Sequence, residues 1–435
     1  MPEKTPRPPL VLTGLWWPVL AVAAVPILTT FSRAAEAATA LLVLAAPWLL
    51  WNERHTLRHD PVWRWLGVFF ALYWVPMLLA LPDAVDPAKS TSQTFVALRF
   101  PLAAFTIVAL TANVERLQRL YALVAVIVAF WLVAGLVDIL AGLGSTSAAS
   151  PGTRPHGPFG DDILRLGLYS ALFLPFLLHP SAAASGARHP WLWTIGLWLA
   201  ALVIFAAGTR SGWIAAALAF GIWAHHRWRA GTPAQRRHGR ALWIGAVLFV
   251  GLAGLITVYQ PEVRSRVTQT GLAFSGRLAD LDAASSYRLP IWRAAVKMAA
   301  DHPLNGVGPR GFRAAYPAYA APGDPFLGHG RLGASHAHQL QLAIMTETGA
   351  LGLVAFIFGV MVFWRGWRRI PAEHRCLAAP PALALLLAVF PFNSHLDAYA
   401  SDPALLFWWL LAVYLAAWRL AVAPGYRSAA APLMS

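Results

Sequence analysis

Long apolar runs recur along almost the whole chain and are separated by short polar connectors. A helix needs about 20 predominantly apolar residues to cross a bilayer, and roughly twelve segments come close to that length. They lie near 14–31, 35–51, 62–81, 95–112, 118–141, 163–180, 191–208, 211–226, 240–258, 339–364, 377–394 and 403–422. The pattern predicts an all-α, polytopic integral membrane protein in which 35–51 and 211–226 are the shortest spans.

The pattern is interrupted once at length. From Val258 to about His336 the apolar runs stop, and a polar, arginine-rich stretch takes their place. The predicted organisation is therefore 1–258 with nine membrane helices, 259–337 as one long, partly helical loop, and 338–435 with three more helices and a tail. We expect the loop to carry the chemistry, because the chain before and after it is predicted to form membrane-spanning helices.

A helix is predicted inside this loop over 286–300, in SYRLPIWRAAVKMAA. Ser285 or Ser286 can cap it, and Pro290 falls in its first turn, where proline is tolerated. Its apolar positions recur at helical spacing, which favours an amphipathic helix lying at the membrane interface. These positions are Ile291, Ala294, Ala295 and Met298. The following DHPLNGVGPRGF is rich in glycine and proline and predicts a turn.

Composition agrees with a membrane protein. The 435 residues are 58% hydrophobic and only 12% charged, about half the charge of a soluble domain. The net charge of +15 would suggest nucleic acid in a soluble protein. Basic cytoplasmic connectors account for much of it here, so we predict no nucleic-acid partner. The single cysteine, Cys376, excludes an intrachain disulfide and a cysteine metal cluster.

Basic residues fall on alternate connectors, as the positive-inside rule requires for cytoplasmic segments. The basic connectors are ERHTLRHD, NVERLQR, HHRWRAGTPAQRRHGR and RGWRRIPAEHR. An acidic connector, PDAVDPAKS, falls on the other side. We therefore expect both termini in the cytoplasm and the 259–337 loop on the opposite face, which is the periplasm in a Gram-negative cell.

The loop has more cations than anions. Its basic residues are Arg264, Arg266, Arg277, Arg288, Arg293, Lys297, Arg310, Arg313 and Arg331, against Glu262, Asp280, Asp282, Asp301 and Asp324. Long loops cross the membrane whatever their charge, so the excess does not contradict the topology. It favours an anionic ligand, either the phosphates of a lipid diphosphate or anionic headgroups, and a solvated surface against anionic lipid explains it equally.

Two arginines stand where phosphate binding is favourable. Arg210, in AAGTRSGWIA, lies in a tight turn, and the amides of Ser211 and Gly212 open the next helix. Arg288 begins the predicted loop helix. The planar guanidinium matches phosphate geometry, so the pair could hold a diphosphate and offset leaving-group charge. The structural alternative is an arginine that extends to lipid headgroups.

His338 stands at the entrance of the tenth span, where a histidine can take a proton from an acceptor hydroxyl. An interfacial histidine bonded to backbone is the structural alternative. His336 and His338 could bind a metal, but no third ligand stands at suitable spacing, so we predict no metal site and no cofactor. Substrate contacts are expected from a second set of residues: Ser211, Arg293, Arg310, His336 and Gln339.

Ionisable residues also fall within or beside the spans, where a functional role and a structural partner across the bundle are both open. They are Arg99, Arg165, Glu347, His395 and Asp397. Glu347 follows His338 by nine positions, which would place it deeper and near the opposite face of a straight helix. The Asp280-Leu281-Asp282 triplet resembles the pattern of metal-dependent glycosyltransferases, but it is too short to outweigh its interpretation as solvated acids.

Four segments resemble the superfamily of bacterial O-antigen ligases and O-antigen polymerases. GTRSGWIAA is similar to a family helix start, T-R-S/G-x-W, and SSYRLPIWRAA to a loop helix, R-x-x-I/L-W-x-A. HPLNGVGPRGF resembles the turn H-P-L-x-G-x-G-x-x-x-F. AHQLQLAIMTETGALG resembles the re-entry A-H-N-x-L-Q-x-x-x-E-x-G-x-x-G, with Gln339 in place of the usual asparagine. Their order also agrees, and they cover roughly the C-terminal half.

The resemblance implies a GT-C-like glycosyltransferase of the bacterial inner membrane. Its expected reaction moves a preassembled glycan from undecaprenyl diphosphate to a hydroxyl of lipid A–core oligosaccharide, with inversion and without a metal. In this role His338 would be the base, and Arg210 and Arg288 would bind the diphosphate. Membrane lipids are the other expected partners. The sequence does not fix the oligomeric state, and a monomer suffices.

Three alternatives remain open at this point. A polymerase would use the same donor with a second lipid-linked glycan as acceptor, but it would be expected to carry two substantial periplasmic loops, whereas 142–162 is short. A protein O-oligosaccharyltransferase would use a protein hydroxyl. A transporter of anions or polysaccharide would place its charges at the membrane midplane rather than at one surface.

Overall fold

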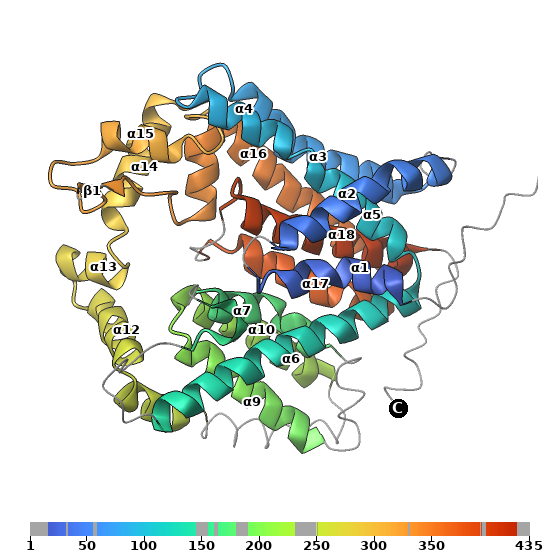
Figure 1. The fold of residues 1–435 in the computed structure, drawn as a ribbon, viewed down its shortest axis with the longest axis horizontal. Coiled ribbons are helices and arrows are strands. Elements are labelled where there is room, and N and C mark those ends of the chain that lie inside the picture. Colours follow the sequence, from blue (N-terminus) through green and yellow to red (C-terminus); the bar gives the residue numbers. More distant parts are fainter. Residues whose placement is uncertain are drawn as a thin grey trace, which may run out of the picture.

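The computed structural model describes residues 16–31, 34–54, 59–144, 155–160, 164–179, 190–230, 249, 251–328, 331–391, 393 and 397–423. Within them the chain is almost entirely helical, apart from one short two-stranded ribbon in the long loop. Figure 1 shows a bundle of long helices with the shorter helices of the loop gathered at one end. The all-α prediction is therefore confirmed for the described residues.

The elements have the following bounds. The helices before the loop are α1 (Trp17–Leu28), α2 (Ala34–Glu53), α3 (Pro61–Leu79), α4 (Pro87–Val96), α5 (Arg99–Leu110), α6 (Val114–Gly144), η1 (Gly157–Phe159), α7 (Arg165–Leu177), α9 (Pro190–Ala206) and α10 (Arg210–Ala230). The loop contains α12 (Pro261–Gly271), η3 (Leu272–Phe274), α13 (Leu278–Ala284), α14 (Leu289–Asp301), α15 (Phe312–Tyr319), β1 (Leu327–Gly328) and β2 (Arg331–Leu332). After it come α16 (Leu340–Arg369), η4 (Ala372–His374), α17 (Arg375–Val389) and α18 (Ser401–Val422).

Seven described helical segments are long and apolar enough to cross a membrane, which makes the chain a polytopic membrane protein. They are Ala34–Asn52, Pro61–Leu79, Pro87–Leu110, Val114–Ala141, Leu340–Arg369, Ala372–Val389 and Ser401–Val422. Shorter apolar helices occupy the predicted spans near 14–31, 163–180 and 191–208. Most of the predicted span 240–258 lies outside the described residues, and the total of twelve stays a prediction.

Helix α18 is the centre of the bundle. More than three quarters of its span is buried, and it packs against α3, α5 and α17. Indoles fill the space between these helices: Trp408 lies parallel to Phe100 at 6.5 Å, and the Trp409 indole nitrogen donates to the Val22 carbonyl at 2.9 Å. Aromatic rings provide large apolar contact areas, and a buried indole N–H usually finds an acceptor, as that of Trp409 does here.

The acidic connector between α3 and α4 lies at the same end of the bundle as the long loop. The Val85 amide donates to the Val307 carbonyl at 3.0 Å, and the Ser90 hydroxyl donates to the Pro309 carbonyl at 2.9 Å. The sequence placed both segments on the non-cytoplasmic side, so their contact agrees with the predicted alternation of connectors.

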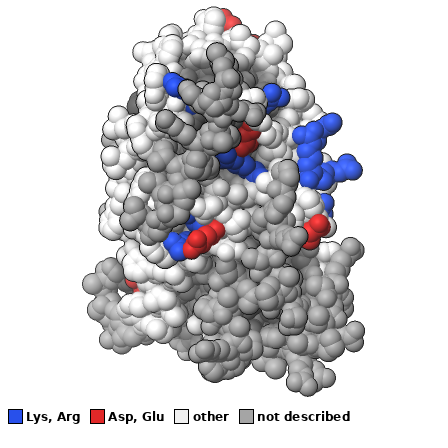
Figure 2. Space-filling view, turned by 90° about the vertical axis from the view of Figure 1, so that its right-hand side faces the viewer, with Lys and Arg blue, Asp and Glu red and all other residues white. Residues whose placement is uncertain are grey.

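A second set of connectors meets at the opposite end. The Arg419 side chain of α18 pairs with Asp60 at 2.5 Å, and the His374 ring contacts the Ala421 carbonyl at 2.9 Å. Figure 2 looks onto this end, the right-hand side of Figure 1, and shows lysine and arginine side chains interspersed with aspartate and glutamate over its described part. The assignment of this end to the cytoplasm stays a prediction.

The loop helix α14 starts later than the predicted 286–300. Ser286 and Tyr287 have φ values of 63° and 59°, a left-handed backbone that cannot belong to an α-helix. The N-cap residue is Arg288, which makes no side-chain capping bond, so neither Ser285 nor Ser286 caps α14 as predicted. The Ser285 hydroxyl accepts from the Arg288 amide at 3.2 Å, and the Asp282 carboxylate accepts from the Leu289 amide at 3.1 Å. Pro290 does fall in the first turn, as predicted.

The apolar face of α14 packs on protein, which corrects the prediction of a helix lying at the membrane interface. All four predicted apolar residues, Ile291, Ala294, Ala295 and Met298, are buried in a core of the loop's own. The covering residues come from α15 and the start of α16, among them Phe312 and Tyr316. The periodicity predicted an apolar face correctly but could not distinguish a protein neighbour from lipid.

Helix α16 is broken at Gly349, where φ is 64° and ψ is −162°. In a continuous helix the amides of Ala350 and Leu351 would bond to carbonyls four residues earlier. Here they donate instead to the carbonyls of Pro303 and Leu304, at 2.8 and 3.1 Å. The glycine-rich turn that follows α14 thus fills the break.

The other side of the break is satisfied by the same turn. The carbonyls of Thr346 and Glu347, freed by the break, accept from the amides of Val307 and Gly308 at 2.8 and 3.0 Å. A Cβ at Gly306 would lie 2.5 Å from the Glu347 carbonyl carbon, so only glycine permits this approach. All four backbone groups released by the break are therefore hydrogen-bonded, as a buried position requires.

Candidate functional site

Arg210 is the first residue of α10 and extends toward the loop. Its guanidinium donates to the Gln269 side-chain oxygen at 3.0 Å, to the Ser286 hydroxyl at 3.2 Å and to the Ala284 carbonyl. Gly208, with φ 68°, makes the turn that lets α10 start at this point. The predicted site residue therefore does reach the loop that was expected to carry the chemistry.

Arg266 and Arg288 complete a group of three cations with Arg210. Arg266, on α12, donates to the Ser286 hydroxyl at 3.4 Å. Burial, together with the charges of Arg210 and Arg266, lowers the pKa of Arg288 to about 10. Three like charges held together from α10, α12 and the start of α14 favour a multiply charged anion between them.

Sequence reasoning missed Arg266. It was one of many cations in the loop, and no motif or spacing distinguished it from Arg264, two residues earlier. Arg264 is exposed, whereas Arg266 is half-buried beside Ser286. The two arginines differ in their surroundings because α12 lies beside the start of α14 and brings Arg266, but not Arg264, to Ser286.

The two predicted histidines lie against each other. The ring centroids of His336 and His338 are 3.9 Å apart. The backbone between them is fixed by α14, because the Trp292 indole nitrogen donates to the Ala337 carbonyl at 3.0 Å. His338 itself has a φ of 52°, a strained value of the kind found at functional sites.

His336 is neutral at physiological pH. Burial lowers its pKa to about 4, and the charges of Arg310 and Arg288 act in the same direction. Its Nδ1 lies 3.0 Å from the Ser335 hydroxyl, and its buried Nε2 has no partner among the described residues. His336 is therefore close enough to both Arg288 and Arg310 for their charges to act on its ring.

Arg310 connects the histidines to the broken helix. Its guanidinium pairs with the buried Asp397 at 2.5 Å, and Asp397 also lies close enough to His338 for their charges to interact. The Arg310 amide donates to the Glu347 carboxylate at 2.7 Å. The structure thus brings Arg310 and His338 together, with a carboxylate beside both.

Three predicted substrate-contact residues have other surroundings. Gln339 caps α16, its side-chain oxygen accepting from the Leu342 amide. Ser211 is 5% exposed, and its hydroxyl has no partner among the described residues. Arg293 is exposed on the outer face of α14. Their substrate contacts stay predictions.

The ionisable residues of the spans have structural partners. Arg99 pairs with Glu36 at 2.8 Å, and Arg165 pairs with Asp402 at 3.0 Å. His395 lies outside the described residues. The described residues contain no group of three or more His, Cys, Asp or Glu side chains that could hold a metal ion.

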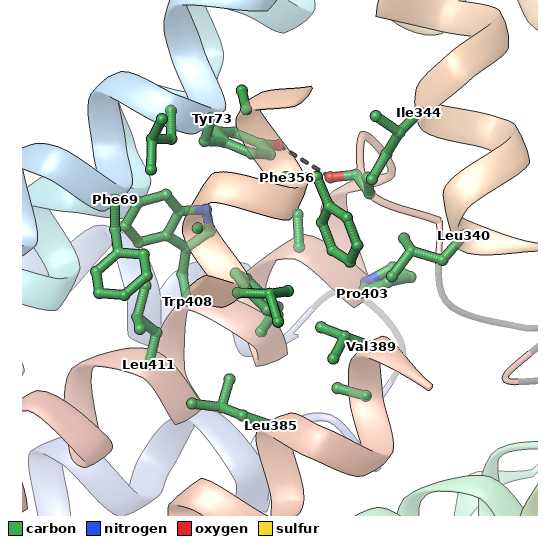
Figure 3. A pocket seen from close by; sticks show the side chains of 18 of the residues that line it. Phe69, Tyr73, Leu340, Ile344, Phe356, Leu385, Val389, Pro403, Trp408 and Leu411 are labelled. Carbon is green, nitrogen blue, oxygen red and sulfur yellow. Dashed lines mark hydrogen bonds between the residues drawn. The ribbon is translucent and has the colours of Figure 1, made fainter. Parts of the chain in front are cut away.

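An apolar cavity of about 170 Å³ begins at Asp397 and continues between α3, α16, α17 and α18. Figure 3 shows its lining: Trp408 and Phe69 on one side, Phe356 and Leu340 on the other, and Leu385 and Val389 across from Tyr73. The Tyr73 hydroxyl donates to the Ala398 carbonyl at 3.0 Å, which keeps the polar end of the cavity ordered. The space suits a hydrocarbon chain whose charged end lies near Arg310.

These features define the class of protein: an integral membrane protein with a cluster of three arginines and two histidines at one end of the bundle. Residues 195–357 match the O-antigen ligase family, which identifies an O-antigen ligase domain here and confirms the resemblance found in the sequence. The match spans Arg210, the long loop and the broken part of α16. The family carries out glycan transfer of the ligase and polymerase type. A search of curated proteins found no match.

Proposed function

We propose that the protein is an O-antigen ligase of the bacterial inner membrane. It would transfer a glycan from undecaprenyl diphosphate to a sugar hydroxyl of lipid A–core oligosaccharide, on the periplasmic face. The observation that carries the proposal is the gathering of Arg210, Arg266 and Arg288, with Arg288 close enough to His336 for its charge to act on that ring. This arrangement suits a reaction that needs both a diphosphate leaving group and a proton acceptor.

In the proposed reaction the arginines bind the diphosphate of the donor. The bond between the first sugar carbon and the phosphate oxygen breaks, and negative charge grows on that oxygen. Fixed guanidinium groups in a partly buried site stabilise this charge without having to reorganise. Arg310, whose charge also acts on His336, adds a fourth cation and is held in place by Asp397.

His338 is the proposed general base. It takes the proton of the acceptor hydroxyl as that oxygen forms its bond to the sugar carbon from the face opposite the diphosphate, so the configuration inverts. Asp397 lies near His338, and a neighbouring carboxylate stabilises the protonated imidazole. His336, neutral and in contact with His338, is the second candidate for the base. Neither step calls for a metal, and metal independence is part of the proposal.

The apolar cavity is the proposed location of the first isoprene units of the donor. Its polar end is Asp397, the partner of Arg310, and its walls are hydrocarbon and aromatic. A polyprenyl chain lying there would place the diphosphate at the loop end of the bundle, where the arginines are.

A two-component assay in detergent tests the function. Undecaprenyl-diphosphate-linked glycan is mixed with lipid A–core, with and without EDTA, using wild type, His338→Ala, His336→Ala and Arg210→Ala. The ligase proposal expects glycan on lipid A–core with wild type, none with His338→Ala or Arg210→Ala, and reduced transfer with His336→Ala. Extension of the lipid-linked glycan alone would establish a polymerase. Loss of wild-type activity on adding EDTA would contradict metal independence.

A further inference from the structure

Ser286 and Tyr287 form a strained corner before α14. Both residues have left-handed φ values, 63° and 59°, and neither is a glycine. A left-handed backbone is strained for a residue other than glycine, and such strain gathers at functional sites. The corner turns the Ser286 side chain toward α10 and α12, where it meets both arginines.

The hydroxyl of Ser286 has its acceptor sites occupied. A serine hydroxyl offers two lone pairs and one proton. Arg210 donates to its oxygen at 3.2 Å, and Arg266 donates to it at 3.4 Å. The proton is therefore left to point away from the two guanidinium groups, and no hydrogen bond from it to the described residues is formed.

The neighbouring Ser285 shows the contrast. Its hydroxyl donates to the Asp282 carbonyl at 2.8 Å and accepts from the Arg288 amide at 3.2 Å. The proton of Ser285 is thus used within the loop, whereas the half-buried Ser286 retains a donor for a ligand. Ser285 therefore makes its hydrogen bonds within the loop, whereas the Ser286 hydroxyl contacts Arg210 and Arg266.

We propose that Ser286 donates its hydroxyl proton to the diphosphate of the lipid donor, and that Arg266 is a third arginine of the same binding site. The inference rests on the proposed function, because it takes the lipid diphosphate as the ligand. By accepting from Arg210 and Arg266 together, Ser286 also holds the two guanidinium groups at a common point. The diphosphate would then meet three guanidinium groups and one hydroxyl.

Two pairs of variants test the inference, each with a matched control. Ser286→Gly removes the hydroxyl and relieves the left-handed backbone, and Tyr287→Gly relieves the same strain at the next position but keeps the hydroxyl. Arg266→Gln removes the charge beside Ser286, and Arg264→Gln removes an exposed charge from the same helix. Binding of undecaprenyl diphosphate and of undecaprenyl monophosphate is measured on the full-length protein in detergent, together with the thermal midpoint.

We expect Ser286→Gly and Arg266→Gln to bind undecaprenyl diphosphate about tenfold more weakly, the effect of losing one hydrogen bond to a charged group. The monophosphate should be affected less, and the thermal midpoint and both controls should stay near wild type. Equal binding of the diphosphate by Ser286→Gly and Tyr287→Gly would overturn the role of Ser286 while the proposed function stands. Wild type that does not bind the diphosphate would overturn both.

Discussion

The backbone amide of Arg310 donates a 2.7 Å hydrogen bond to the carboxylate of Glu347, a residue with no exposed surface. Arg310 has a left-handed φ of 62°, so its amide and side chain leave the turn in different directions. The amide is held by the broken helix α16, and the guanidinium reaches Asp397. A buried acid on a membrane helix thus sets the position of a cation in the site.

Glu347→Leu removes the acceptor of the Arg310 amide. The buried amide is left without a partner, which costs about 1–3 kcal/mol of stability, and Arg310 loses its position in the site. We expect a lower thermal midpoint and a strongly reduced transfer rate. Glu347→Gln retains an oxygen acceptor and should keep the fold. Glu115→Leu, at an exposed i,i+4 pair with Arg119, serves as control and should be nearly neutral. Equal stability of Glu347→Leu and Glu115→Leu would contradict the role.

Gly306→Ala places a Cβ 2.5 Å from the Glu347 carbonyl carbon, at a φ of 69°. Strain and overlap together should destabilise the protein by about 3 kcal/mol and remove activity. Gly323→Ala is the matched control, because its φ of 76° is similar and no atom lies within 4 Å of the added Cβ. It should cost only about 1 kcal/mol. Thermal unfolding in detergent compares the two, and similar losses would mean that backbone strain alone matters.

Asp397→Asn removes the charge that pairs with Arg310. Breaking a buried ion pair leaves one charge uncompensated, which costs on the order of 3 kcal/mol. Asp280→Asn removes an exposed ion pair with Arg277 and should change stability little. We expect Asp397→Asn also to lower the transfer rate, because Asp397 lies near His338. Unchanged transfer in Asp397→Asn would show that the carboxylate does not act on the base.

Acid should destabilise the protein through His336. Its pKa is lowered from 6.5 to about 4 by burial and neighbouring arginines. Between these values the unfolded chain binds more protons than the folded one, so stability rises with pH across this window. The protonation of His336 therefore costs no stability above about pH 6.5, and the free energy of unfolding decreases as the pH falls from 6.5 toward 4. The thermal midpoint of His336→Gln should therefore fall less steeply with acid than that of wild type or His302→Gln. Parallel curves would contradict this.

Gly359→Leu tests the cavity. Gly359 lines it, and an added Cβ would meet only Leu72, at 3.8 Å, so a larger side chain would enter the space at little cost. If the cavity holds the donor chain, KM for the lipid-linked glycan should rise several-fold with a stable fold. Gly67→Leu, at an exposed helical glycine with nothing within 4 Å of its Cβ, is the control. An unchanged KM in Gly359→Leu would place the chain elsewhere.

Local patterns in the sequence predicted much of this architecture. Apolar runs located the helices, and the alternation of basic connectors predicted which connectors share an end, as the Val85–Val307 contact illustrates. Motifs found Arg210, Arg288 and His338, because each stands at the start of an element with a recognisable pattern.

Tertiary contacts determined the rest. Arg266 enters the site only because α12 passes beside the start of α14. We predicted that Glu347 would lie deeper than His338, near the opposite face of a straight helix. In the structure α16 is broken at Gly349, and the turn at Gly306 brings the amide of Arg310 to the Glu347 carboxylate. Periodicity could not show that α14 would be covered by α15 and α16 rather than by lipid. Each of these outcomes depends on a segment distant in sequence.

The break in α16 has a consequence for how the protein is made. A membrane helix normally enters the bilayer with its own hydrogen bonds complete, but the amides of Ala350 and Leu351 have their partners at Pro303 and Leu304. The turn emerges from the ribosome before α16, so these partners already exist when the helix is synthesised. Insertion of α16 and docking of the loop should therefore be a single step of biogenesis. A substitution that prevents docking would then be expected to yield a misinserted chain rather than an inactive, correctly inserted enzyme.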